Sequence, residues 1–229
     1  FNLMKNLSSL YAFYSWNGDI EKEELEEQMR GFAAQSFTGV FIHARAGLEI
    51  PAFSKLWFDR FGLAISIAKK WTMEIGIYDE NGWPSGFGNG AVNGLGEKYW
   101  QKKLVLEKDF SCSSHKKLLA SYKKDGEKYV RCEKAEGELF AVVEEIPEYV
   151  DLLSPLVTNA FLKASHEVYR RHFGEEFGKT IKYLFTDEPQ LAAPYSYTEG
   201  LEEIFLNEYG YDMLDELWRF AFETQEFGK

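Results

Sequence analysis

The chain has 229 residues, of which 45% are hydrophobic and 28% are charged, a balance typical of a globular protein. Its formal net charge of −11 argues against nucleic acid and anionic membranes as partners, because both bind basic surfaces. No apolar stretch approaches the roughly 20 residues that a membrane-spanning helix needs.

The ends and the cysteines say little about cellular location. The sequence begins at Phe1 without a signal-peptide pattern, and we expect a processed form or a part of a longer chain. The location stays open, with the cytoplasm favoured over secretion. Cys112 and Cys132 lie in one segment without metal-ligand spacing, so reduced thiols are expected, and a disulfide between them is the alternative.

Strands and helices alternate over the first 80 residues. Strands are predicted over residues 10–16, 40–42 and 73–78. Apolar residues at helical spacing predict two helices between them, and Ser54 is expected to cap the second helix. This alternation is typical of βαβ units, which form parallel sheets.

The rhythm then breaks. Residues 81–96 are rich in Gly and Asn and predict a long functional loop. Residues 100–146 contain short alternating strands, with Asp125-Gly126 as a hairpin signal between two of them, and predict a small antiparallel β insertion.

Helical spacing resumes after the insertion. Ser154-Pro155 starts a predicted helix that ends at Gly174, a fourth parallel strand follows at 181–186, and further helices are expected at 200–209 and from 212. The predicted fold is an α/β, (β/α)₈ TIM-barrel-like fold that is partial, with about four βα units. The predicted domains are residues 1–98 and 149–229 for the barrel, with the inserted β module at 99–148.

Two buried strands end in carboxylate pairs, Asp79-Glu80 and Asp187-Glu188. Because unpaired buried carboxylates are costly and ligands bind at the carboxyl ends of parallel strands, these pairs suggest acid chemistry there. Cleavage of a glycosidic bond needs two carboxyl groups, one acid and one base or nucleophile. Glu188, Asp187 and Glu80 are the candidate catalytic residues; an exposed loop position for Glu188 and a turn-capping role for Asp79 and Glu80 are the alternatives.

Other polar side chains are predicted at the same edge. Asn17, His43, Arg45 and Asp79 are candidate substrate-binding residues, and an ion pair between Arg45 and one of the acids is the structural alternative. Trp83 lies in the Gly-rich loop, where it suits a sugar-stacking platform or local loop packing.

Three motifs in the same order carry a family resemblance: Gly-Val-Phe-Ile-His-Ala-Arg at 39–45, Tyr-Asp-Glu-Asn-Gly-Trp-Pro-Ser-Gly-Phe at 78–87, and Phe-Thr-Asp-Glu-Pro at 185–189. Together they resemble the catalytic barrel of the α-L-rhamnosidase-like enzymes of glycoside hydrolase family 106, over roughly residues 8–96 and 150–225. The resemblance implies an inverting hydrolase with two carboxylic acids, and it allows for a calcium ion (Ca2+) near the site. It also implies an acid/base role for Glu188 and sugar-pocket positions for Asp79, Glu80 and Trp83. That family's barrel has eight strands, whereas four are predicted here, so the sequence matches the N-terminal half and leaves the second carboxylate open.

The leading hypothesis is a glycoside hydrolase that acts on an oligosaccharide or glycoside, including α-L-rhamnosides. One alternative is a non-catalytic carbohydrate-binding or structural fragment of a larger glycosidase. Another is a metal-dependent barrel enzyme, in which the Asp-Glu pairs bind a divalent ion. Unpaired sheet edges also predict a homo-oligomer, unless the remainder of a longer chain covers them.

Overall fold

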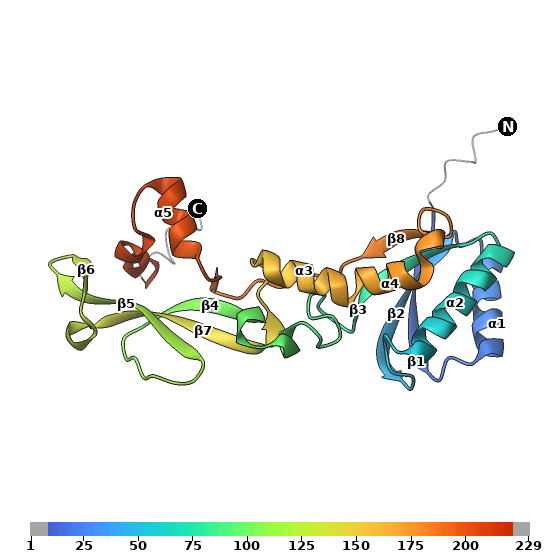
Figure 1. The fold of residues 1–229 in the computed structure, drawn as a ribbon, viewed down its shortest axis with the longest axis horizontal. Helices are drawn as coiled ribbons and strands as arrows, with labels where there is room; N and C mark the ends of the chain where they lie inside the picture. The colour runs from blue at the N-terminus through green and yellow to red at the C-terminus, as the bar shows by residue number, and fades with distance from the viewer. Residues whose placement is uncertain (1–8, 222–229) are drawn as a thin grey trace. The chain divides into compact units, whose positions relative to one another are not determined.

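The computed structural model describes residues 9–221, drawn in colour in Figure 1. The chain divides into two compact units. Unit 1 comprises the residues up to 92 together with 159–189, and unit 2 comprises residues 93–158 and those from 190 on. Each unit is built around one sheet of its own.

Unit 1 contains a parallel sheet of four strands in the order β1-β2-β3-β8. The strands are β1 (Tyr11–Gly18), β2 (Gly39–Leu48), β3 (Glu74–Asn81) and β8 (Ile181–Phe185). All four predicted parallel strands are therefore confirmed. β2 and β3 run further than expected, so that Arg45, Asp79 and Glu80 belong to the strands themselves.

Helices cover one face of this sheet, as Figure 1 shows for α1 (Lys22–Ala34) and α2 (Lys55–Lys70). Ser54 caps α2 as predicted, because its Oγ accepts a hydrogen bond of 3.2 Å from the Trp57 backbone N–H. The core under the helices includes Trp16, Trp57 and Phe61, together with Tyr169 from α4 (His166–Phe173). Burial of these large rings stabilises unit 1.

The opposite face of the sheet carries aromatic rings that stay partly exposed. Side chains alternate between the two faces of a strand, so every second residue of β1, β2 and β8 lies on this side. Phe13, Phe41 and Phe185 contact one another there, with ring centroids 4.9 to 5.8 Å apart. Phe13 remains 54% exposed.

Unit 2 contains the predicted antiparallel sheet, in the order β6-β5-β7-β4-β9. Its strands are β4 (Trp100–Glu107), β5 (Lys116–Asp125), β6 (Lys128–Cys132), β7 (Leu139–Val150) and β9 (Tyr195–Tyr197). The hairpin at Asp125-Gly126 joins β5 to β6 as expected. Met213 and Leu217 from the C-terminal segment pack into the core of this sheet beside α5 (Leu201–Tyr209).

Three local predictions differ from the structure. The helix expected from Ser154 to Gly174 is two helices, α3 (Pro155–Ala164) and α4, because Ser165 leaves helical geometry at φ −118° and ψ −81°. Strand β9 was not predicted; it is short and pairs with β4. The helix expected from 212 is a pair of 3₁₀ segments. The 3₁₀ segments are η1 (Asn93–Leu95), η2 (Glu97–Tyr99), η3 (Lys134–Glu136), η4 (Gly174–Glu176), η5 (Met213–Asp215) and η6 (Leu217–Ala221).

The predicted (β/α)₈ TIM-barrel-like fold is wrong. A TIM barrel closes eight parallel strands into a ring, whereas residues 9–221 form one open parallel sheet of four strands and one antiparallel sheet. β1 and β8 are the two edges of the parallel sheet and do not pair with each other. Within the same residues, no helix combines the length and the apolar character needed to cross a membrane.

Candidate functional site

The carboxyl ends of the four parallel strands bring most of the predicted site residues to one edge of unit 1. The register pairs Ser15 with His43 across β1 and β2, and Tyr78 with Phe185 across β3 and β8. Because the strands are parallel, the residues that follow these positions also end at that edge.

Asp79 is fully buried, and both of its carboxylate oxygens are bound. Oδ1 accepts a hydrogen bond of 2.6 Å from Ser85 Oγ, and Oδ2 accepts one of 2.6 Å from Thr186 Oγ1. His166 Nε2 lies 3.5 Å from Oδ2. Burial raises the pKa of Asp79, and the hydroxyl donors and His166 oppose that shift. Asp79 thus joins the ends of β3 and β8 from inside the protein.

Glu80 is also buried, and its carboxylate accepts hydrogen bonds from four backbone amides. Oε1 accepts from the N–H groups of Asn81 and Asn89 at 2.9 and 2.5 Å. Oε2 accepts from Gly86 and Gly88 at 3.3 and 2.6 Å. Burial raises the pKa of Glu80 and the amides oppose that shift. This carboxylate therefore fixes the conformation of the loop after β3. That role agrees with the turn-capping alternative to catalysis given for Glu80 from the sequence.

Asp187 is half-buried, and Tyr78 and Ser85 fix its position. The hydroxyl of Tyr78 lies 2.5 Å from Asp187 Oδ2 and donates to it. The Asp187 backbone exchanges two hydrogen bonds of 2.9 Å with Ser85, one with the Ser85 hydroxyl and one with its N–H. Burial raises the pKa of Tyr78, so the phenol stays protonated and remains a donor. The other carboxylate oxygen of Asp187, Oδ1, has no hydrogen bond to residues 9–221.

His43 lies beside this pair as a neutral ring. It is 4% exposed, its ring centroid lies 4.8 Å from that of Tyr78, and its Nε2 is 3.0 Å from Ser15 Oγ. Burial lowers the pKa of His43 to about 4, with a smaller contribution from the charge of Arg45. At neutral pH the ring therefore exchanges hydrogen bonds without carrying charge.

Arg45 and Asn17 are exposed at the same edge. Within residues 9–221, the Arg45 guanidinium has no ion pair, so the ion pair with a neighbouring acid is not formed. Its charge nevertheless lies close enough to lower the pKa of His43 and to oppose the raised pKa of Tyr78.

Glu188 and Trp83 are the most open of the predicted site residues. Glu188 is exposed and has a φ of +39°, a left-handed conformation that side chains other than glycine seldom adopt. Such strain is more common at functional sites than elsewhere. Trp83 is 47% exposed in the loop that Glu80 holds.

A hollow of about 510 Å³ opens beside Arg45. It is lined by residues 44–48 and 50–52 of β2 and the turn after it, and by residues 81 and 82 at the end of β3. This volume lies within the range of about 300–1,000 Å³ that is usual for small-molecule sites.

Sequence reasoning missed several residues of this edge. Ser15, Tyr78, Ser85 and Thr186 contact the predicted residues directly. His166 of α4 lies against Asp79. The alternation of β1 and the parallel register could have indicated Ser15. Ser85 and His166 lie against Asp79 only because the loop after β3 and helix α4 fold back over it, which no local sequence pattern indicates.

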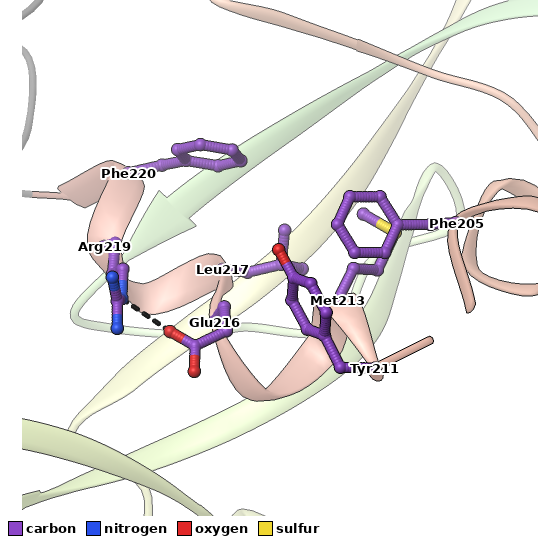
Figure 2. Close-up of a pocket in the computed structure, with 7 residues that line it drawn as sticks. All are labelled: Phe205, Tyr211, Met213, Glu216, Leu217, Arg219 and Phe220. Atoms are coloured by element: carbon purple, nitrogen blue, oxygen red, sulfur yellow. Dashed lines mark ion pairs between the residues drawn. The ribbon is translucent and has the colours of Figure 1, made fainter. Parts of the chain in front are cut away.

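A second hollow, of about 500 Å³, lies in unit 2 and is drawn in Figure 2. Figure 2 shows the rings of Phe205 and Tyr211 beside Met213, and an ion pair between Glu216 and Arg219 in which Oε2 and Nε are 2.5 Å apart. The lining is largely apolar, its one carboxylate is paired, and none of the strand-end residues belongs to it. We therefore place the candidate site in unit 1.

The side chains of the described residues do not form a metal-binding cluster. Within residues 9–221, no three or more His, Cys, Asp or Glu side chains are grouped so that they could hold a metal ion. The oxygens of Asp79 and Glu80 are taken by protein donors. Asp79 and Glu80 therefore offer no free carboxylate oxygens to a Ca2+ or other divalent ion.

Comparisons with known proteins add little. No protein-family model matches the chain, and no curated protein matches it either. Among solved structures, it is similar to a rhamnosidase from Novosphingobium sp. PP1Y, with 21% identity and a TM-score of 0.35, over 53% of this chain and 12% of that one. The chain thus spans about an eighth of that protein's length, and a likeness this low carries no argument about fold or function.

Proposed function

We propose that unit 1 binds a carbohydrate at the carboxyl edge of its parallel sheet and hydrolyses a glycosidic bond there. The observation that supports this most is the half-buried Asp187 carboxylate, which is held by the Tyr78 hydroxyl next to the neutral His43 ring. Such a group has one fixed oxygen and one oxygen free for a sugar hydroxyl or a water.

The two carboxyl groups in this proposal are Asp187 and Glu188. Glu188 is the general acid or base, because it is exposed at the exit of β8 and its carboxylate has no bond to the described residues. As an acid it would donate its proton to the leaving glycosidic oxygen, and as a base it would take a proton from the attacking water. Asp187 would orient the sugar or supply the second carboxylate.

The remaining residues have supporting roles. Trp83 offers its exposed ring as a surface for the C–H face of a pyranose. Asn17, His43 and Ser15 offer polar groups to hydroxyls of the sugar. Glu80, predicted as catalytic, is assigned a positioning role because both of its oxygens already accept from the loop that carries Trp83.

The relation to glycoside hydrolase family 106 is part of this proposal and rests on the three sequence motifs. It makes α-L-rhamnosides the first substrates to test. Other aryl glycosides belong in the same panel, because the described contacts do not select one sugar.

The test is hydrolysis of a panel of aryl glycosides by the whole protein. We expect Glu188→Gln and Asp187→Asn to reduce turnover by at least about a hundredfold, the usual size of a general acid–base contribution. Glu27→Gln is the matched control, because Glu27 is an exposed glutamate on α1 in the same unit, and it should leave turnover unchanged. Turnover that survives both site variants would contradict the proposed roles.

A second candidate is carbohydrate binding without turnover. One observation favours it: Asp79 and Glu80 are engaged in protein hydrogen bonds, so the two accessible carboxylates sit on adjacent residues. Inverting glycosidases keep their two carboxyl groups about 6.5–9.5 Å apart on opposite sides of the bond. Sugar binding in calorimetry with no hydrolysis of any panel member would support this candidate over the first.

A further inference from the structure

The Arg45 side chain is an unused cation beside a hollow. It is exposed near the end of β2 and has no ion pair within residues 9–221. The charge of Asp187 nevertheless lies close enough to affect the pKa of His43, as the charge of Arg45 does. The whole chain carries 37 acidic and 26 basic residues, so an arginine left without an acidic partner is not explained by a shortage of acids.

The space beside Arg45 suits a small polar ligand. The hollow of about 510 Å³ has Arg45 and Asn81 as its polar lining, and the rest is small or apolar. Asn81 donates its side-chain amide to Asn89 Oδ1 at 2.7 Å, which leaves the amide oxygen of Asn81 without a bond to the described residues. The lining therefore offers one fork of cationic donors and one neutral acceptor.

The chemistry of the guanidinium points to the kind of group that it would take. Its donors lie in a planar fork that matches the two oxygens of a carboxylate, and such pairs are stronger than hydrogen bonds between neutral groups. A neutral sugar would use only single hydrogen bonds of this fork. The acids Asp187 and Glu188 at the same edge would disfavour an anionic ligand unless a cation faced its charge.

We propose that the hollow binds the carboxylate of an acidic sugar, a uronic acid residue, on the guanidinium of Arg45, with a sugar hydroxyl donating to the amide oxygen of Asn81. This subsite rests on the proposed function, since it assigns a substrate class to the same edge of unit 1. It makes Arg45 the residue that distinguishes acidic from neutral glycosides.

Calorimetric titration of the whole protein with methyl glucuronide, methyl glucoside and glucose 6-sulfate tests the subsite. We expect the glucuronide to bind at least about tenfold more tightly than the glucoside, and Arg45→Gln to remove that difference, because charged hydrogen bonds of this type contribute on this scale. Arg45→Lys should restore part of it, since lysine keeps the charge but loses the fork. Arg30→Gln, which changes an exposed arginine on α1, should alter nothing.

The outcomes separate this subsite from the proposed function. Equal binding of glucuronide and glucoside, or glucuronide binding that is unchanged in Arg45→Gln, overturns the subsite and leaves carbohydrate binding in place. Binding of none of the three sugars overturns the subsite, whereas the proposed function is overturned only when no member of the aryl glycoside panel is bound or hydrolysed. Preference for the sulfate over the glucuronide overturns the assignment to a carboxylate. Unchanged thermal unfolding of Arg45→Gln and Arg45→Lys shows that each variant is folded.

Discussion

Glu80 shows how a single buried charge can organise a segment of this chain. Its carboxylate accepts from amides at positions 81, 86, 88 and 89, so one side chain satisfies four backbone donors of the loop. Charged hydrogen bonds of this kind offset the cost of burying the carboxylate. Glu80 of β3 therefore holds the loop that carries Trp83 and Ser85.

Glu80→Gln should destabilise the protein by about 2–3 kcal/mol, because the new amide group would place a donor against backbone donors. Urea unfolding followed by tryptophan fluorescence measures this change. Hydrogen exchange should also become faster at the amides of Gly86, Gly88 and Asn89. Glu27→Gln should stay within about 0.5 kcal/mol of the unchanged protein. An unchanged midpoint together with unchanged exchange would refute this role of Glu80.

His43 predicts a specific dependence of stability on pH. Its pKa is about 4 in the folded protein against 6.5 for the free side chain, so between these values the unfolded state binds more protons. The contribution of His43 is complete above pH 6.5 and is lost as the pH falls toward 4. The free energy of unfolding should drop by about 3 kcal/mol over that window from this group.

The difference between the unchanged protein and His43→Gln isolates the effect, because Asp79 and Glu80 titrate in both. The gap between their two curves of unfolding free energy against pH should change by that amount from pH 6.5 to pH 4 and stay constant above pH 7. An NMR titration that places the His43 ring near pH 6.5 would contradict the assignment.

At the scale of elements, the packing of β3 against β2 requires a glycine at position 76. A Cβ at Gly76 of β3 would lie 2.2 Å from Cδ1 of Phe41 on β2, well inside contact distance. Phe41 cannot turn away freely, because its ring packs against Phe13, Tyr183 and Phe185. The aromatic face of the sheet thus requires a residue without a side chain in the middle of β3.

Gly76→Ala should destabilise the protein by about 1–3 kcal/mol through this overlap. The same change in a Phe41→Ala background should cost less, and a double-mutant cycle in urea measures the coupling. Gly31→Ala is the control, since a Cβ at Gly31 meets nothing within 4 Å and alanine in a helix interior adds about 0.5–1 kcal/mol. Equal costs of Gly76→Ala in both backgrounds would exclude the overlap as the cause.

For the whole molecule, the sheet of unit 1 leaves apolar surface at both edge strands. Phe13 on β1 is 54% exposed, and Tyr183 and Leu184 on β8 are 47% and 41% exposed. Edge strands with exposed apolar side chains favour association. The predicted homo-oligomer remains a prediction, and the edges of this sheet are where we expect it to form.

Light scattering should give about twice the mass of one chain for the unchanged protein, and Phe13→Asp should give the mass of a single chain. Ile204→Asp is the matched control, because Ile204 is 62% exposed on α5 in unit 2 and the change should leave the dimer intact. A single-chain mass for the unchanged protein at high concentration would refute the expectation.

The sequence by itself determined the local elements of this protein. Apolar runs and helical spacing predicted all four parallel strands and the helices α1 and α2. A helix with one buried face has apolar residues at helical spacing, and a strand with both faces buried is an apolar run. Turn chemistry predicted the hairpin at Asp125-Gly126, and the ends of the strands predicted which polar residues share an edge.

The tertiary structure decided closure and the state of each carboxylate. Whether four parallel strands close into a barrel depends on which strands pair at the edges, and here β1 and β8 stay unpaired with each other. The two Asp-Glu pairs have different environments, although they look alike in the sequence. Asp79 and Glu80 are buried and accept hydrogen bonds from the loop and from the end of β8. Asp187 is half-buried and bound by Tyr78, and Glu188 is exposed. Hydrogen bonds between residues as far apart as 109 positions, as between Tyr78 and Asp187, have no periodic signal along the chain, so only the fold could assign them.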